Sequence, residues 1–82
     1  MSRYRVAYAD PAAVGRNALP ADARKRFDAG IAALARDPYG CRSSSVKGSR
    51  DRRDAAIGGV ALIRYEVSSG VLIVTVLRVV GL

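Results

Sequence analysis

The residues of this sequence best suited to chemistry are its arginines, and many of them are concentrated in one segment. Within residues 42–53, five cations stand against a single anion, which leaves a net charge of +4. The cations are Arg42, Lys47, Arg50, Arg52 and Arg53. The interleaved serines and glycines add hydroxyl groups and unhindered backbone N–H groups, which also suit phosphate oxygens. The segment is therefore a candidate for contact with a nucleic-acid backbone, although a solvated connecting loop has the same composition.

Two further arginines stand in apolar segments that have the pattern of strands. Arg64 lies within residues 60–67 and Arg78 within residues 71–80. A cation on an apolar strand is costly unless it reaches solvent or an anionic partner. Because a short turn joins the two segments, we expect adjacent strands, and the two cations form an anion site if they share a face. The alternative is an ordinary ion pair, for which Glu66 is close enough in sequence.

The absence of histidine excludes several classes of chemistry. The 82 residues contain no histidine and one cysteine. Ser-His-Asp and Cys-His pairs, His-based zinc sites and a histidine general base are therefore ruled out, and we predict no metal and no cofactor. Chemistry would have to rest on arginine, lysine, tyrosine, serine or carboxylates.

Charge and hydropathy restrict the setting and the partners. The formal net charge of +7 favours a nucleic acid or an acidic protein as partner. Cys41 alone cannot form an internal disulfide, and no apolar signal segment follows the first charges, so we expect a cytoplasmic protein. The apolar run near the C-terminus is interrupted by Arg78 and is shorter than the ~20 residues of a membrane span. We therefore predict no membrane contact.

The N-terminal half has the pattern of one strand and two helices. Residues 3–9 alternate as a half-exposed strand does. Asp10 as N-cap and a following proline predict a short helix to Asn17. Apolar residues at helical spacing predict a second helix over residues 21–36, which Asp37 and the following proline end.

The C-terminal half has the pattern of a loop followed by three strands. Residues 41–50 have no apolar period and predict a loop, whereas strands are expected at residues 53–57, 60–67 and 71–80, with Gly58-Gly59 as the first turn. The last of these is an almost continuous β-branched run, which is typical of a central strand.

This order of elements predicts one α+β domain over residues 1–82. Strands this apolar need a cover, and the two helices are the only elements available to provide it. We therefore expect a small, mostly antiparallel four-stranded sheet with two N-terminal helices packed on one face, in the order β-α-α-β-β-β.

Six local strings, taken in their order and spacing, connect the chain to a known family. They are Tyr4-Arg5-Val6-Ala7-Tyr8, Leu19-Pro20, Leu34-Ala35-Arg36-Asp37-Pro38-Tyr39-Gly40, Ile57-Gly58-Gly59, Ile63-Arg64-Tyr65-Glu66-Val67 and Leu77-Arg78-Val79. On these residues the chain resembles the RelE/ParE superfamily of toxins from type II toxin–antitoxin systems, over nearly its whole length.

The resemblance implies a RelE-like, ribosome-dependent mRNA endonuclease that inhibits translation. Such a toxin needs no metal, because arginines stabilise the charge that develops when a ribose 2′-hydroxyl attacks the adjacent phosphate. Carried over to this sequence, the catalytic residues are Arg53, Arg64 and Arg78. The RNA-binding residues are Arg42, Lys47, Arg50 and Arg52. The implied partners are a cognate antitoxin, the ribosome and mRNA, with no small-molecule cofactor.

Two features differ from the family pattern and keep other functions open. Residues 60–63 read Val-Ala-Leu-Ile where the family has Tyr-Arg, so that Arg64 is displaced from the position of the family's arginine. In addition, the basic, tyrosine-containing tail of active relatives does not follow Leu82. The alternatives are a ParE-like inhibitor of DNA gyrase, and a catalytically weak module that keeps the toxin fold and binds an antitoxin or RNA.

Overall fold

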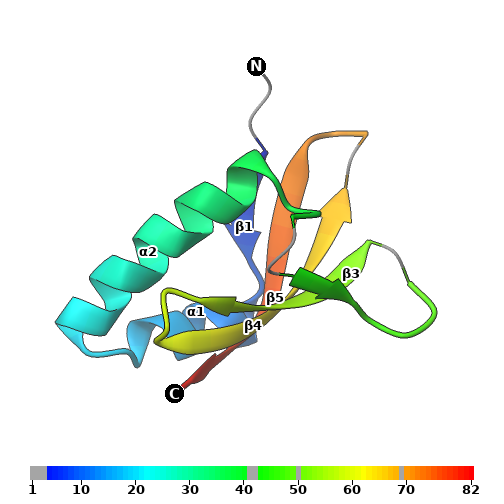
Figure 1. Cartoon of the computed structure of the whole chain (residues 1–82). Helices are drawn as coiled ribbons and strands as arrows, with labels where there is room; N and C mark the ends of the chain where they lie inside the picture. Colours follow the sequence, from blue (N-terminus) through cyan, green and yellow to red (C-terminus); the bar gives the residue numbers. More distant parts are fainter. Residues whose placement is uncertain (1–3, 41–42, 50, 69) are drawn as a thin grey trace.

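The computed structural model describes residues 4–40, 43–49, 51–68 and 70–82. Within these ranges it contains two helices and five strands, which are coloured along the chain in Figure 1. Their bounds are β1 Arg5–Tyr8, α1 Asp10–Asn17, α2 Ala21–Arg36, β2 Ser43–Ser45, β3 Arg52–Ile57, β4 Ala61–Ser68 and β5 Ile73–Gly81.

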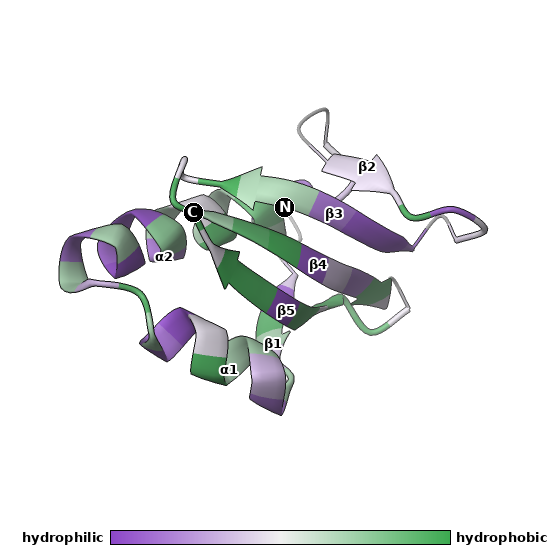
Figure 2. Cartoon of the chain, turned by 90° about the horizontal axis from the view of Figure 1, so that it is seen from below, coloured by the Kyte–Doolittle hydropathy of each residue, from purple (hydrophilic) through white to green (hydrophobic). Residues whose placement is uncertain are grey.

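The strands form one mixed sheet in the order β1-β5-β4-β3-β2. β1 runs parallel to β5, and the other three pairs are antiparallel. Both helices lie on one side of this sheet, and the other side has no helical cover (Figures 1 and 2). The predicted α+β class, with a mostly antiparallel sheet and two helices on one face, is confirmed. The strand β5 lies between β1 and β4, as expected for a central strand.

The sheet has one strand more than the sequence predicts. Ser43–Ser45 pairs antiparallel with β3 inside the segment expected to be a loop. This edge strand is three residues long and entirely polar, so it has no apolar period by which a strand could be recognised. Cys41, Arg42 and Arg50, which belong to the same segment, lie outside the described residues.

The helix α2 follows its predicted bounds because one of its faces is apolar. Phe27, Ile31 and Ala35 recur at helical spacing and are buried against the sheet. In α1 the predicted cap is wrong by one residue. Ala9 is the N-cap, and Asp10 lies in the first turn, where its carboxylate is favoured by the helix dipole.

Close packing of α1 on the sheet explains a glycine that would otherwise weaken this helix. A Cβ atom at Gly15 would lie 2.5 Å from the carbonyl oxygen of Val79 on β5 and 3.0 Å from its Cβ. Only glycine therefore allows the backbones of α1 and β5 to approach this closely.

The predicted alternation of β4 is confirmed by its burial. The residues that face the helices are Ala61, Ile63, Tyr65 and Val67, and all four are buried. Leu62, Arg64 and Glu66 lie on the opposite side, which we call the open face of the sheet. β4 thus contributes one set of side chains to the core and the other set to the open face.

The turn between β3 and β4 is one residue longer than predicted. Gly58 and Gly59 both have positive φ, and Val60 belongs to the loop, because β3 ends at Ile57 and β4 begins at Ala61. Ile57 therefore pairs with Ala61, and every partner along the two strands is shifted by one residue.

A β-bulge in β5 decides which way Arg78 points. Val74 and Val76 are buried, so a regular strand would also turn Arg78 into the core. The register instead passes from Tyr65↔Val76 to Arg64↔Arg78, which leaves Leu77 as the additional residue. The bulge reverses the alternation, so that Arg78 is exposed on the open face.

Candidate functional site

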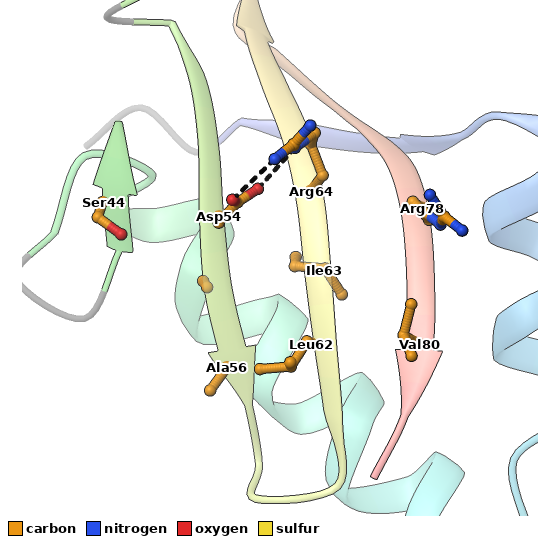
Figure 3. Close-up of a pocket in the computed structure, with 9 residues that line it drawn as sticks. Ser44, Asp54, Ala56, Leu62, Ile63, Arg64, Arg78 and Val80 are labelled. Carbon is orange, nitrogen blue, oxygen red and sulfur yellow. Dashed lines mark hydrogen bonds and ion pairs between the residues drawn. The ribbon is translucent and has the colours of Figure 1, made fainter. Parts of the chain in front are cut away.

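A shallow groove of about 440 Å³ lies on the open face of the sheet. Figure 3 shows its residues, which come from β2, β3, β4 and β5. They are Ser44, Asp54, Ala55, Ala56, Leu62, Ile63, Arg64, Arg78 and Val80. One transverse row of this groove is polar and charged, and the next row is apolar.

The charged row brings together two of the arginines that the sequence singles out. Arg64 and Arg78 are Cα partners on β4 and β5, and both line the groove (Figure 3). The expectation that they lie on adjacent strands is therefore confirmed, and they also share a face, a point that the sequence left open. Like charges directly across a strand pair are destabilising. The arrangement is therefore favourable for an anion that could contact both guanidinium groups.

Asp54 extends this row on the other side of Arg64. Its two carboxylate oxygens accept hydrogen bonds from Arg64 Nε at 2.8 Å and Nη2 at 3.0 Å. The hydrogen bond from Arg64 lowers the pKa of the Asp54 carboxyl, and the same contact raises the pKa of Arg64. Both side chains are 48% exposed, so this ion pair is open to water. Ser44 on β2 is the Cα partner of Asp54 and completes the row.

Arg78 has a different environment from Arg64. It is exposed, and it makes no hydrogen bond or ion pair with the side chains of residues 4–40, 43–49, 51–68 and 70–82. In Figure 3 its guanidinium group lies on the β5 side of the groove, away from the Asp54–Arg64 pair. Arg78 is thus a cation directed at solvent on the floor of an open groove.

The apolar row lies two residues further along the same strands. Ala56 pairs with Leu62, and Leu62 pairs with Val80. The exposed fractions of Leu62 and Val80 are 48% and 47%. At the usual rise per residue, this row is ~6.8 Å from the charged row. Figure 2 shows the change along β3, from purple in its first half to green in its second.

Arg52 lies on the open face but pairs with Glu66. Its Nη2 is 3.2 Å from the Glu66 carboxylate, and the two residues are Cα partners on β3 and β4. The alternative of an ordinary ion pair thus holds for Arg64, but its partner is Asp54 and not Glu66. The cause is the register, which places Asp54 rather than Glu66 opposite Arg64.

Arg53 lies on the opposite side of the sheet from Arg64 and Arg78. Its Cα partner on β4 is the buried Tyr65, and its Nε donates to Ser43 Oγ at 2.9 Å. Its guanidinium carbon is also 5.5 Å from the ring centroid of Tyr39, within the range of a cation–π contact. The structure thus brings Arg64 and Arg78 together and places Arg53 in a separate environment.

One more of the predicted residues is described, and it does not line the groove. Lys47 is exposed in the turn between β2 and β3, and Arg42 and Arg50 lie outside the described residues. Asp54 is the site residue that sequence reasoning missed. The alternation of β3 indicates that it shares a face with Arg52, but only the register places it opposite Arg64.

The described ranges contain neither a metal-binding cluster nor a membrane-spanning helix. No group of three or more Cys, Asp or Glu side chains there is arranged to hold a metal ion. None of the helices there is long and apolar enough to cross a membrane.

Comparisons with known proteins give matches in structure alone. Neither a family model nor a curated protein matches the sequence. A chain of the RelBE2 toxin–antitoxin complex from Mycobacterium tuberculosis matches with a TM-score of 0.81 and 19% identity, over 99% of this chain and 100% of that chain. A chain of the archaeal RelE–RelB complex from Pyrococcus horikoshii matches with a TM-score of 0.80 and 19% identity, over 98% of this chain and 96% of that chain. The isolated Escherichia coli RelE toxin matches with a TM-score of 0.80 and 15% identity, over 95% of this chain and 83% of that chain.

These similarities establish the fold. The chain has the α+β fold of a group of small toxins from toxin–antitoxin systems. More particularly, it has the RelE fold, and the fold implied by the sequence resemblance is confirmed.

Proposed function

We propose that this chain is the toxin of a type II toxin–antitoxin system and acts as a RelE-like, ribosome-dependent mRNA endonuclease. The observation that carries the proposal is the juxtaposition of Arg64 and Arg78 in the groove of the open face. The RelE fold supports the toxin assignment. Because no helix covers the open face, an extended RNA strand can reach both cations.

The proposed reaction is a transesterification within the RNA strand. The ribose 2′-oxygen forms a bond to the adjacent phosphorus, and the bond from phosphorus to the 5′-oxygen of the next nucleotide breaks. The 2′-hydroxyl loses its proton, the 5′-oxygen gains one, and the products are a 2′,3′-cyclic phosphate and a 5′-hydroxyl. Negative charge accumulates on the phosphoryl oxygens in the transition state, where arginine side chains stabilise it.

We assign this role to Arg78 and Arg64. Arg78 is exposed and directed at solvent, and Arg64 presents a planar fork of donors that matches a phosphate. Asp54 is a poor candidate for the general base, because the hydrogen bond from Arg64 lowers its pKa and so weakens its basicity. In this proposal the ribosome supplies the alignment of the RNA, which accounts for a large part of the rate.

An antitoxin is the second proposed partner. The solved complexes of the RelE fold contain RelB. This chain carries a net charge of +7, and its open face has exposed apolar side chains beside its cations. An acidic, partly apolar segment of an antitoxin would complement such a surface, and it would exclude RNA from the groove.

The test is cleavage of a defined mRNA by the purified chain, with and without translating ribosomes. We expect cleavage only with ribosomes, and at least a tenfold loss of rate for both Arg64→Ala and Arg78→Ala. Lys25→Ala, which removes an exposed cation from α2 on the other side of the sheet, is the matched control and should cleave normally. Arg53→Ala is the third variant, and an unchanged rate would remove Arg53 from the catalytic residues. Cleavage that survives both groove substitutions would show that the groove is not the site.

A further inference from the structure

An internal anion occupies part of the groove that the proposed function assigns to RNA. Asp54 is held by two donors of Arg64, in the two-pronged geometry that arginine also adopts with phosphate. The Nε–Nη2 edge of Arg64, one of the two edges through which it can bind a phosphate, is therefore already engaged. Arg78, in the same row, is not engaged by any described carboxylate.

The sheet register fixes this arrangement. Asp54 and Arg64 are Cα partners on β3 and β4, and Arg64 and Arg78 are Cα partners on β4 and β5. Backbone pairing therefore places the carboxylate on one side of Arg64 and the second cation on the other. A phosphate that binds between the two arginines through the Nε and Nη2 donors of Arg64 would have to turn this side chain away from Asp54, and would therefore compete with Asp54 for Arg64.

The Asp54–Arg64 pair is suited to exchange with a ligand. Each side chain is 48% exposed, and exposed ion pairs contribute little to stability because water screens them. A single phosphate has to displace the carboxylate with no second phosphate to hold it in the groove. An RNA strand can bind Arg78 through one phosphate, which raises the effective concentration of its neighbouring phosphate at Arg64.

We infer that Asp54 is a competing anion for the phosphate site of Arg64, and that it makes the groove selective for ligands with consecutive phosphates. In this role Asp54 is a positioning residue that limits binding. The inference rests on the proposed function only in its choice of RNA as the natural ligand, because inorganic anions test the competition by themselves.

The test compares the affinity of the full chain and its variants for two probes at constant ionic strength. The probes are a short single-stranded RNA, followed by fluorescence anisotropy, and inorganic phosphate, followed by NMR of the arginine Nε–H groups. The variant is Asp54→Asn, which keeps the shape of the side chain and removes its charge. Glu66→Gln is the matched control, because it removes one negative charge and one ion pair from the same face.

We expect Asp54→Asn to raise the affinity for phosphate by about two- to fivefold, which is the range set by the strength of an exposed ion pair. The increase for RNA should be smaller, so that the preference for RNA over phosphate falls. Glu66→Gln should raise both affinities equally and by less. In an Arg64→Gln background, Asp54→Asn should have no more effect than Glu66→Gln.

Other outcomes separate the inference from the proposed function. If Asp54→Asn lowers the affinity for both probes, Asp54 holds Arg64 in place for binding and the inference is overturned. If Asp54→Asn and Glu66→Gln raise the affinities by equal factors, the effect is due to the net charge of the chain alone, and the inference is also overturned. If phosphate binds with the expected pattern but RNA affinity does not respond to Arg78→Gln, the competition holds and the assignment of RNA to the groove fails.

Discussion

Substitution of Gly15 by alanine tests whether close packing of α1 on β5 positions the site. In an exposed helix interior, Gly→Ala would stabilise the chain by ~1 kcal/mol through helix propensity. Here the added Cβ would lie 2.5 Å from the carbonyl oxygen of Val79, and the backbones would have to separate by about 0.9 Å to reach the 3.4 Å of an ordinary contact. A backbone oxygen cannot rotate away as a side chain can.

The cost of this overpacking is ~2–3 kcal/mol, at the upper end of the usual range. It exceeds the gain in helix propensity, so we expect Gly15→Ala to be destabilising by ~1–2 kcal/mol, with a fall in Tm of roughly 5–15 °C for a chain of this size. Because Val79 follows Arg78 on β5, the shift of the strand should also reduce cleavage of mRNA.

The assay is thermal and urea unfolding followed by circular dichroism. Val14→Ala is the control in the same helix, because Val14 is 69% exposed and its replacement should change stability by less than ~0.5 kcal/mol. If Gly15→Ala is as stable as the natural chain or more stable, the close approach of α1 to β5 is not real.

Three further predictions concern the strand irregularity and two titrating groups. Deletion of Leu77 should remove the bulge and leave the following arginine on the open face, so the protein should still fold and bind RNA. Deletion of Thr75 should instead exchange the buried and exposed side chains of the strand and abolish folding. Circular dichroism distinguishes the two outcomes. Because Arg64 lowers the pKa of Asp54, their ion pair contributes fully to the free energy of unfolding above about pH 4, and this contribution is lost as the pH falls through the lowered pKa. Asp54→Asn should therefore reduce the loss of stability at acid pH, as measured by urea unfolding at varied pH. Burial raises the pKa of Tyr8, so this side chain contributes fully to the free energy of unfolding below about pH 10, and the contribution is lost as the pH rises further. Tyr8→Phe should remove this loss of stability at alkaline pH. An unchanged loss in the variant would show that Tyr8 does not cause it.

The helix α2 and the strands β1 and β4 could be predicted because apolar side chains recur with a regular period on one face of each, whereas α1 is indicated by Asp10 and the following proline and β5 by its continuous β-branched run. The alternation of β4 is the clearest case, since its buried positions coincide with the apolar face read from the sequence. β2 could not be predicted, because Ser43–Ser45 is an edge strand whose pairing depends on backbone hydrogen bonds to β3 and leaves no apolar pattern.

The partners of the site residues depend on two local irregularities that the sequence does not show. A two-residue turn at Gly58-Gly59 would place Asp54 opposite Ile63, and the three-residue loop places it opposite Arg64. Simple alternation from Val76 would bury Arg78, and the bulge exposes it. Each effect is a slip of one residue, which is enough to move a side chain to another partner or another face.

The most direct test of the central claim is induced expression of this chain alone in bacterial cells, with mRNA ends mapped by primer extension. The account predicts growth arrest with new ends inside translated codons, and loss of both effects for Arg64→Ala and Arg78→Ala but not for Lys25→Ala. Arrest without new mRNA ends would contradict the nuclease assignment and favour inhibition of DNA gyrase. Growth without arrest would contradict the assignment as an active toxin and leave a binding module with the RelE fold.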